Sequence, residues 1–325
     1  MLKTNHSPYI IAEVGSNWKS LGDLIESIKQ AKKAGADAVK FQMFSWRELY
    51  GFPEDSERQR NLDKYQLPKA YFQTLHKASQ EHDIDFMCTG FSFEGFQFIN
   101  PFVKYHKIAS SDSMDTGLIR AVLSMRKPVL ISLGGKSLAD AQSLAKHLEK
   151  HQDQVALLHC ISQYPAAISE PHMIKLLRIA TNDKFMLGFS DHSTDATTIP
   201  WLAVKHYGAQ IIEKHFKITD MDTPDSGHSL NPHNFKIMVN KLKHDHDPDL
   251  LDEQKDMVYR HSKRLVAIKH IRRGEVLHYG QNYAAHRSLT DQPFAFPPYA
   301  PHMVEAKKAV IDLMPGTALT TELIE

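Results

Sequence analysis

Polar and ionisable residues recur at the ends of short apolar runs over the first two thirds of the chain. In chain order they are Glu13, Lys40, Gln42, Thr89, Lys107, Ser110, Asp112, His159, Tyr164, Ser190, Asp191, His192, Glu213 and His215. Any one of them, such as Glu13 or Lys40, could belong to a structural ion pair. A buried charge is costly without a partner, so the repetition of the pattern indicates one functional site that gathers these groups.

Two of these residues, His192 and His215, could bind a divalent metal ion. Each ends an apolar run, and the two runs follow one another along the chain. Adjacent strands lie about 4.8 Å apart, so histidines at neighbouring strand ends could reach one ion. Two nitrogen ligands would leave positions open for water and a substrate carbonyl, which the metal would polarise. A histidine by itself is more often structural, and the other histidines of this chain have no assigned role.

Five further strand-end residues are suited to bind an anion. They are Lys40, Thr89, Lys107, Ser110 and Ser190. Lysines and hydroxyls are common partners of phosphate and carboxylate groups. There is no Walker-type loop, and no G-x-G-x-x-G follows an apolar run, so nucleotide binding is not supported. The pair Gly134-Gly135 is more typical of a turn than of a phosphate-binding loop.

The elements that would hold these residues form a regular series. Eight short, largely apolar stretches are expected to be strands, at 9–14, 36–41, 85–89, 105–109, 128–133, 155–160, 185–189 and 209–215. Their apolar residues are consecutive, as in parallel strands covered on both faces. Between them lie amphipathic helical patterns, for example over 20–35. We therefore predict an α/β fold, a (β/α)8 TIM barrel over 1–245, whose site lies at the carboxyl ends of its strands.

Three other segments complete the predicted organisation. The long gap from 43 to 85 contains the polar stretch 54–64 and is expected to be an extended loop. Residues 246–262 are polar and charge-dense, which indicates a linker. Residues 263–325 hold short β-rich runs and turn signals at Arg273-Gly274 and Pro315-Gly316, which favours a small β-rich domain over a ragged extension.

Composition excludes several classes of function. The 325 residues include 39 Lys and Arg and 38 Asp and Glu, a formal net charge of +1, so no basic surface for nucleic acid is indicated. There is no apolar run long enough to span a membrane, and no signal peptide is recognised. The only cysteines, Cys88 and Cys160, suit a reducing compartment, and we expect a cytoplasmic protein. Cys160 lies in an apolar run and is expected to be an inert core thiol.

Nearly the whole chain resembles the sialic acid synthases, which condense phosphoenolpyruvate with an N-acylated amino sugar. The matching segments are IIAEVGSNW (10–18), AGADAVKFQ (34–42), CTGFS (88–92), YHKIASSD (105–112), LLHCISQYP (157–165), GFSDHS (188–193), EKHF (213–216) and HSLNP (228–232). The tail resembles the antifreeze-like (SAF) domain of that family through 264–277 and 308–325. The resemblance implies a TIM-barrel catalytic domain over 1–245, a linker over 246–262 and an antifreeze-like domain over 263–325.

The resemblance also implies roles for individual residues. His192 and His215 would hold Mn²⁺ or Mg²⁺, and Lys40, Thr89, Lys107, Ser110 and Ser190 would bind phosphoenolpyruvate. The sugar would contact Glu13, Gln42, Ser162, Tyr164, Asp225 and Arg287. The catalytic residues would be Glu13, Lys40, Asp112 and Tyr164, with Asp112 near the attacking water. The small domain of one subunit would cover the barrel of the other in a domain-swapped homodimer.

Four positions depart from the family pattern, and all are on the sugar side. Asp112 stands where the family has glutamate, and Ser162 where it has asparagine. The Arg-Pro-Gly signature of the small domain is replaced by residues 286–289, in which Arg287 is the candidate arginine. The Pro-Gly-Pro-Asp stretch is shortened to Pro224-Asp225. We therefore expect the phosphoenolpyruvate donor to be kept, while the sequence does not name the acceptor sugar.

Three alternatives remain open at this point. The acceptor could be N-acetylmannosamine or a diacetamido-trideoxyhexose, as in pseudaminic or legionaminic acid synthases. A lysine aldolase that forms a Schiff base with pyruvate could use Lys107 or Lys214 as the nucleophile. A synthase fold that has lost catalysis could serve as a sugar-binding protein, which the altered sugar side suggests and the intact donor side argues against.

Overall fold

The computed structural model describes residues 7–52, 56–167, 171–244, 263–287 and 295–325. The chain divides into two compact units, Met1–His246 and Asp247–Glu325, which are described separately. The predicted linker, 246–262, lies outside the described residues.

The first unit is a closed barrel of eight parallel strands, which hydrogen-bond in chain order until β8 meets β1. The strands are β1 (Tyr9–Glu13), β2 (Ala38–Gln42), β3 (Asp85–Thr89), β4 (His106–Ile108), β5 (Val129–Ser132), β6 (Val155–Cys160), β7 (Met186–Asp191) and β8 (Ile211–His215). Each falls within or beside a predicted stretch. The predicted (β/α)8 TIM barrel is therefore confirmed.

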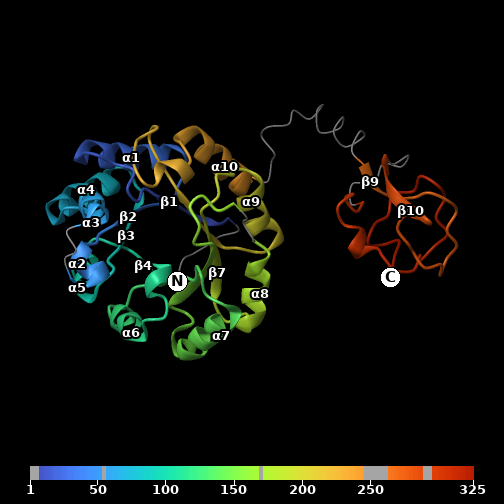
Figure 1. The fold of residues 1–325 in the computed structure, drawn as a ribbon, viewed down its shortest axis with the longest axis horizontal. Coiled ribbons are helices and arrows are strands. Elements are labelled where there is room, and N and C mark those ends of the chain that lie inside the picture. Colours follow the sequence, from blue (N-terminus) through green and yellow to red (C-terminus); the bar gives the residue numbers. More distant parts are fainter. Residues whose placement is uncertain (1–6, 53–55, 168–170, 245–262, 288–294) are drawn as a thin grey trace. The chain divides into compact units, whose positions relative to one another are not determined.

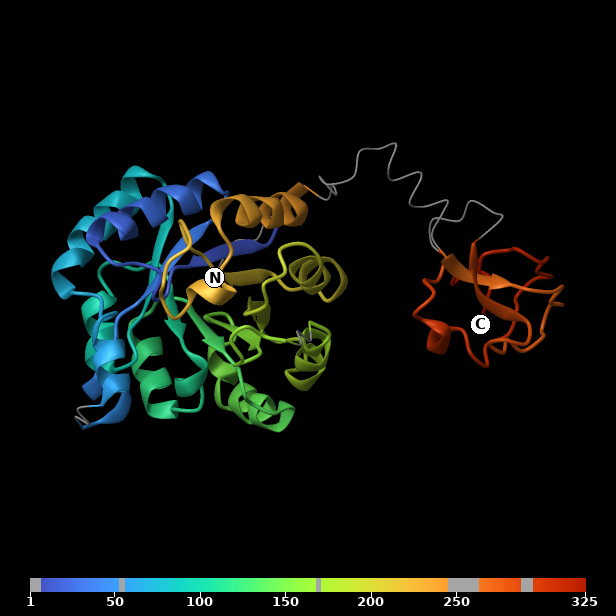
Figure 2. The same ribbon diagram turned by 45° about the horizontal axis from the view of Figure 1, so that its top comes forward.

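Helices surround the barrel on its outside (Figures 1 and 2). They are α1 (Leu21–Lys33), α2 (Trp46–Tyr50), α3 (Glu57–Asp63), α4 (Phe72–Glu81), α5 (Phe93–Ile99), α6 (Thr116–Ser124), α7 (Leu138–His147), α8 (Met173–Ala180), α9 (Thr198–Trp201) and α10 (Pro232–His244). In α1, the predicted helix over 20–35, Ser20 accepts a hydrogen bond from the Asp23 N–H in a capping box, and the chain turns away at Gly35 with φ +93°.

The expectation of an extended loop between 43 and 85 is wrong. Much of that segment is helical, in α2, α3 and α4. The polar stretch 54–64 contains α3, which Ser56 begins by accepting a hydrogen bond from the Gln59 N–H. A helix is recognised in a sequence by apolar residues that recur every three or four positions. A polar helix lacks this repeat, so the sequence does not indicate it. In α4, Phe72, Leu75 and Ala78 form the buried face that covers the barrel.

Two layers of apolar residues hold the barrel together. Between strands and helices lies a core that includes Ile10, Val39, Phe86 and Leu187. Residues on the alternate positions of the same strands, such as Ile11, Met87 and Leu158, fill the inside of the barrel. Side chains alternate along a strand, so every second residue points into the barrel. The polar residues at the inner positions of the strand ends therefore lie next to these apolar residues, at the carboxyl-terminal opening of the barrel.

The second unit has a small apolar core and a two-stranded antiparallel sheet. β9 (Lys263–Ala267) pairs with β10 (Tyr283–Arg287), and isolated bridges join further segments, such as Val266 to Ala318. The two predicted turns are present, since Gly274 and Gly316 have φ values of +82° and +87°. These features agree with the predicted β-rich tail.

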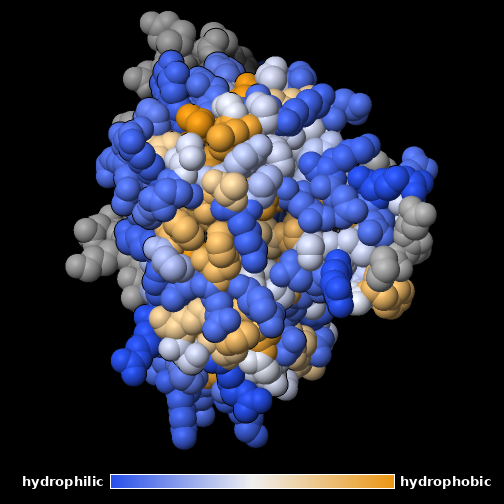
Figure 3. Space-filling model, turned by 90° about the vertical axis from the view of Figure 1, so that its left-hand side faces the viewer, coloured by the Kyte–Doolittle hydropathy of each residue, from blue (hydrophilic) through white to orange (hydrophobic). Residues whose placement is uncertain are grey.

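The face of the barrel unit that carries α2 to α5 is largely hydrophilic, with a group of hydrophobic side chains near its middle (Figure 3). Among the described residues, the exposed large apolar side chains of this stretch are Phe52 and Phe93. No helix in the described part of the chain combines the length and the hydrophobicity that a membrane crossing requires.

Candidate active site

The register of the barrel brings the strand ends of β1, β2 and β8 to one level. Glu13 pairs in register with Lys40 on one side and with His215 on the other, and Ser190 pairs with Glu213. All five side chains are buried. Since they occupy inner positions, they converge on the mouth of the barrel, where the sequence predicted the site.

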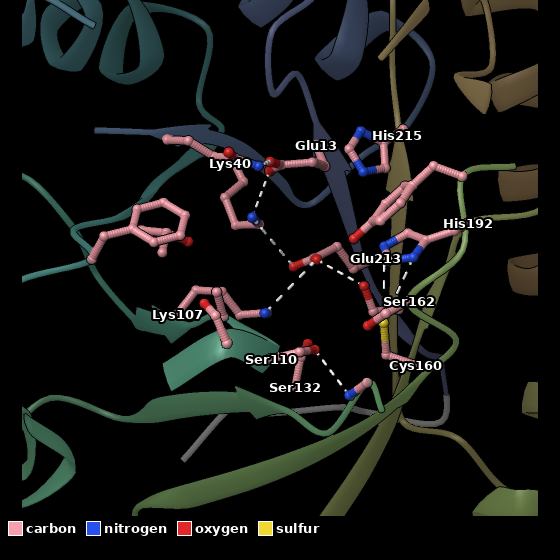
Figure 4. Close-up of a pocket in the computed structure, with 18 of the residues that line it drawn as sticks. Glu13, Lys40, Lys107, Ser110, Ser132, Cys160, Ser162, His192, Glu213 and His215 are labelled. Carbon is pink, nitrogen blue, oxygen red and sulfur yellow. Dashed lines mark hydrogen bonds and ion pairs between the residues drawn. The ribbon is translucent and has the colours of Figure 1, made fainter. Parts of the chain in front are cut away.

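A network of buried ion pairs forms the floor of this mouth (Figure 4). Lys40 Nζ lies 2.6 Å from Glu13 Oε2 and 3.7 Å from Glu213 Oε2. Lys107 Nζ lies 3.9 Å from Glu213 Oε1, which also accepts a 2.9 Å hydrogen bond from Ser190 Oγ. Two lysines thus share two carboxylates, and Glu213 joins three of the other groups.

Burial and the neighbouring charges shift the pKa values of this network in different directions. Burial raises the pKa of Glu13, and the repulsion of Glu213 adds to this. Burial also acts to raise the pKa of Glu213. The positive charges of Lys107 and Lys40 outweigh this effect, so the pKa of Glu213 is lowered. Burial lowers the pKa of Lys107 despite the attraction of Glu213. Because the pKa values of the two carboxyl groups differ, Glu13 can carry a proton while Glu213 stays ionised.

Above this floor lies a cavity of about 430 Å³. The predicted site residues that line it are Glu13, Lys40, Gln42, Thr89, Lys107, Ser110, Ser162, Tyr164, Ser190, His192 and His215. These predicted residues come from seven of the eight strand ends, all except that of β5. Gln42 donates a 2.6 Å hydrogen bond to Glu13, which fixes the orientation of that carboxylate.

Asp225 and His228 join His215 in a cluster that could hold a metal ion, with one ligand atom of each lying within 4.8 Å of the others. Nδ1 of His215 and Nε2 of His228 are buried and lack a hydrogen-bond partner among the described residues. Burial lowers the pKa of His215 to about 3, so its imidazole is neutral at physiological pH. Neutral imidazoles and a carboxylate are typical ligands of a divalent transition metal.

His192 lies beside this cluster, with its ring centroid 5.4 Å from that of His215. Its Nδ1 donates a 2.7 Å hydrogen bond to the Ile161 carbonyl oxygen, which leaves Nε2 available as a ligand atom. The ring of Tyr164 packs against that of His192 in a tilted arrangement, at 4.3 Å between centroids, and also contacts His228. The tyrosine therefore covers the histidines on the side of the cavity.

Cys160 lines the cavity, whereas the sequence predicted a core thiol at this position. Cys160 Sγ lies 3.7 Å from His192 Nδ1 and is buried (Figure 4). Burial raises the pKa of its thiol to about 11, so the nucleophilic thiolate is scarce at neutral pH. The raised pKa favours an unreactive thiol, although its position at the cavity is not that of a core residue.

Three of the predicted site residues are not among those that line the cavity. Asp112 lies in the short 3-10 turn Ser110–Asp112, one residue beyond Ser111, which does line it. Asp225 is beside the cavity, in the cluster with His215. Arg287 is the exposed last residue of β10, in the second unit.

Several residues of the site were missed as site residues by the sequence analysis. Glu213 had been recognised only as a polar strand end, although its spacing of two from His215 places both on the same side of β8. Ser132 lines the cavity as the last residue of β5. His228 could have been found through the segment HSLNP, which it begins.

Lys214, one of the two candidate aldolase lysines, is not in the cavity lining. It donates a 2.6 Å hydrogen bond to Asp191 and also binds the carbonyl and hydroxyl oxygens of Ser193. It alternates with Glu213 and His215 along β8, so it points to the opposite side of the strand. Lys107 is the candidate that remains in the site.

An eight-stranded parallel barrel with paired lysines, hydroxyls and a histidine–carboxylate cluster at its mouth defines a TIM-barrel protein with a polar cavity at the carboxyl ends of its strands. Comparison with known proteins identifies the family. The chain belongs to the NeuB family, whose profile matches residues 27–247.

Individual relatives agree with this assignment. The chain is 31% identical over 257 residues to the N,N'-diacetyllegionaminic acid synthase of Legionella pneumophila, covering 72% of this chain and 71% of that protein. It is 29% identical over 299 residues to the pseudaminic acid synthase of Campylobacter jejuni, covering 84% and 85%. The crystal structure of an N-acetylneuraminic acid synthetase from Leptospira borgpetersenii, in complex with citrate, superposes with a TM-score of 0.66 at 29% identity, covering 80% of this chain and 93% of that one.

Proposed function

We propose that this protein condenses phosphoenolpyruvate with an N-acylated amino-sugar aldose, giving a nonulosonic acid and inorganic phosphate. The observation that carries the proposal is the shared cavity. Buried Lys40 and Lys107 lie on one side of it, and His192 and His215 lie on the other (Figure 4). The names of the relatives, which include legionaminic, pseudaminic and sialic acid synthases, support the same reaction.

Lys40, Lys107, Thr89, Ser110 and Ser190 would bind the donor. In the reaction C3 of phosphoenolpyruvate attacks the aldehyde carbon, forming a C–C bond, and the aldehyde oxygen gains a proton. Water adds to the cationic C2 and loses a proton, and phosphate then leaves with the bridging oxygen by C–O cleavage. The lysines therefore need only to bind and orient the phosphate, and Glu213 would stabilise the nearby positive charge.

The acceptor would lie against Glu13, Gln42, Ser162 and Tyr164. Glu13 is suited to hold or release a proton near neutral pH, because burial raises its pKa. We assign the water-orienting role to Asp112, as the resemblance implies. Tyr164 would exclude bulk water from the reacting atoms by covering the histidines.

The residues fit a divalent metal, Mn²⁺ or Mg²⁺, and we assign it to His215, Asp225 and His228, with His192 at its edge. When bound, the ion would polarise the aldehyde oxygen of the open-chain sugar as a Lewis acid. Asp225 is held in place by the Ser16 N–H, which donates a 2.7 Å hydrogen bond to its Oδ2.

We also propose that residues 263–325 form an antifreeze-like domain that covers the barrel of a partner subunit in a homodimer, with Arg287 contacting the acyl group of the sugar. Exposure of Arg287 in the second unit leaves it available for that contact. Sedimentation gives the oligomeric state, and Arg287→Ala should raise the KM for the sugar with little effect on the KM for phosphoenolpyruvate.

A phosphate-release assay tests the central proposal. Purified protein is given phosphoenolpyruvate, Mn²⁺ and one of several aldoses, including N-acetylmannosamine and a diacetamido-trideoxyhexose, and each component is omitted in turn. Phosphate should appear only when all three are present, and the active sugar identifies the acceptor. Absence of phosphate release with every amino sugar, in protein shown to hold metal, would overturn the proposal and favour a non-catalytic sugar-binding protein.

The aldolase alternative rests on the lowered pKa of Lys107, which would favour a nucleophilic amine. Borohydride reduction in the presence of pyruvate distinguishes it. A Schiff-base enzyme would gain a covalent adduct on Lys107, which mass spectrometry would locate, whereas the proposed synthase would gain none.

A further inference from the structure

When all four of its buried ion-paired groups are ionised, the inner charges of the cavity cancel one another. Lys40 and Lys107 carry two positive charges, and Glu13 and Glu213 carry two negative charges when ionised. A donor that carries a carboxylate and a phosphate ester on the same carbon brings several negative charges into this site. Because both lysines are already paired with carboxylates, binding such an anion favours a further cation at the mouth.

Lys136 is a half-buried cation that lines the same cavity. In the described part of the chain, no carboxylate lies within 4.0 Å of its ammonium group. Asp140 is the acidic residue that follows it, but that carboxylate accepts hydrogen bonds from the N–H and the hydroxyl of Ser137, at 2.9 and 2.7 Å. Lys136 therefore differs from Lys40 and Lys107 in lacking a short ion pair among the described residues, although its charge adds to the Ser137 hydrogen bonds in lowering the pKa of Asp140.

The loop after β5 places Lys136 at the mouth through a tight turn. The Lys136 N–H donates a 3.1 Å hydrogen bond to the Leu133 carbonyl, and Gly135, at the third position, has φ +71°. A positive φ there is typical of a type II turn and favours glycine. The pair Gly134-Gly135 thus forms a turn, as the sequence indicated, and this turn presents the lysine that follows it.

Gly134 fixes the turn against the cavity wall. Its N–H donates a 2.9 Å hydrogen bond to Ser110 Oγ (Figure 4). A Cβ at this position would lie 2.2 Å from Ser162 Oγ and 2.8 Å from Ser110 Oγ, so the backbone approaches these residues as closely as glycine permits. The turn that precedes the lysine is therefore anchored on Ser110, a predicted donor-binding residue. Ser132, whose buried hydroxyl lacks a partner among the described residues, lines the same cavity as Lys136.

We propose that Lys136 is a third cation of the donor site and binds the phosphate group of phosphoenolpyruvate. This inference rests on the proposed function. Lys136 acts by binding and by selecting a phosphorylated donor over pyruvate. It makes no bond to the reacting atoms, because phosphate leaves by C–O cleavage and needs no transfer to the protein.

Calorimetric titration of phosphoenolpyruvate and of inorganic phosphate, without sugar or metal, tests the proposal in wild type, Lys136→Gln and Lys136→Arg. The matched control is Lys146→Gln, an exposed lysine of α7 that lines a different cavity. Lys136→Gln should weaken binding of both anions about tenfold, as expected for one charge-assisted hydrogen bond at a partly exposed site. Lys136→Arg should restore most of the affinity, and Lys146→Gln should leave it unchanged.

Steady-state kinetics add a second readout. Lys136→Gln should raise the KM for phosphoenolpyruvate by a similar factor while kcat and the KM for the sugar stay close to wild type. A fall in kcat without a change in the KM for phosphoenolpyruvate would overturn the assignment, as would equal binding of both anions by wild type and Lys136→Gln. In the latter case the proposed function would stand. If wild-type protein bound neither anion, the proposed function would fail together with this inference.

Discussion

Gly15 and Asp225 are in such close contact that a Cβ added to the glycine would lie 2.2 Å from Asp225 Oδ2. Gly15 also has φ +55°, a conformation that favours glycine. The next residue, Ser16, binds Asp225 twice, through its N–H to Oδ2 and through its Oγ to the Asp225 N–H. The turn after β1 thus positions the carboxylate of a loop that follows β8.

We expect Gly15→Ala to displace Asp225 and weaken metal binding. The added methyl group would clash with the carboxylate, and the left-handed conformation would cost about 1–2 kcal/mol of stability for alanine. Isothermal titration with Mn²⁺ should show a loss of affinity of about tenfold or more, as is typical when a residue that orients a metal ligand is disturbed. Gly227→Ala, in the same loop as Asp225, is the control, since its Cβ would meet no atom within 4 Å. Equal affinities in the two variants would contradict the role given to Gly15.

The two assignments of the metal ligands make different predictions. If His215, Asp225 and His228 hold the ion, His215→Gln and His228→Gln should each reduce Mn²⁺ affinity by roughly tenfold or more. The exposed residue His151 provides a control variant, His151→Gln, which should bind as wild type does. Electron paramagnetic resonance of bound Mn²⁺ gives the affinity without turnover. Full affinity in His228→Gln together with a large loss in His192→Gln would instead support the pair expected from the sequence.

Substitution of Glu213 should separate stability from anion binding. Glu213→Gln leaves Lys40 and Lys107 with one carboxylate fewer in a buried site, and we expect a loss of about 3 kcal/mol or more in the free energy of unfolding. Added phosphoenolpyruvate would supply the missing negative charge, so it should raise the Tm of Glu213→Gln more than that of wild type. Glu149→Gln, which removes a surface ion pair with Lys184, should change Tm little. A smaller ligand-induced shift in Glu213→Gln would count against this view of the network.

His106 should make the barrel less stable in mild acid. Burial lowers its pKa to about 4, and the charge of Lys127 acts in the same direction. The unfolded chain takes up a proton near pH 6.5, whereas folded His106 stays neutral until the pH approaches 4, so this contribution to stability is present at pH 7 and is lost as the pH falls. Between pH 7 and pH 5 the loss should be about 2 kcal/mol.

Denaturant unfolding of wild type and His106→Gln at both pH values measures that difference. The variant should lose about 2 kcal/mol less than wild type over this interval, because glutamine does not titrate. His151→Gln, an exposed site, should keep the wild-type dependence. Identical pH dependence in wild type and His106→Gln would show that His106 does not contribute.

The repeating parts of the fold could be predicted from local sequence. Consecutive apolar residues marked each of the eight strands, and the capped amphipathic pattern marked α1. Polar residues on the ends of parallel strands had to meet at one mouth, which is why eleven of the predicted site residues line a single cavity. The helix α3 was missed because its polar residues carry no apolar period.

The sequence by itself thus determined the barrel, the set of groups at its mouth and the resemblance to one family, since each depends on local pattern or motif. Only the tertiary structure decided which charges are partners. The barrel register places Glu213 within ion-pair distance of both Lys40 and Lys107. Ser16 hydrogen-bonds to Asp225 although 209 positions separate them in the chain. His228, from a loop that follows β8, lies beside His215. The turn formed by Gly134 and Gly135 places Lys136 in the cavity lining. Contacts of this kind depend on how distant segments pack against one another, and no local periodicity records that.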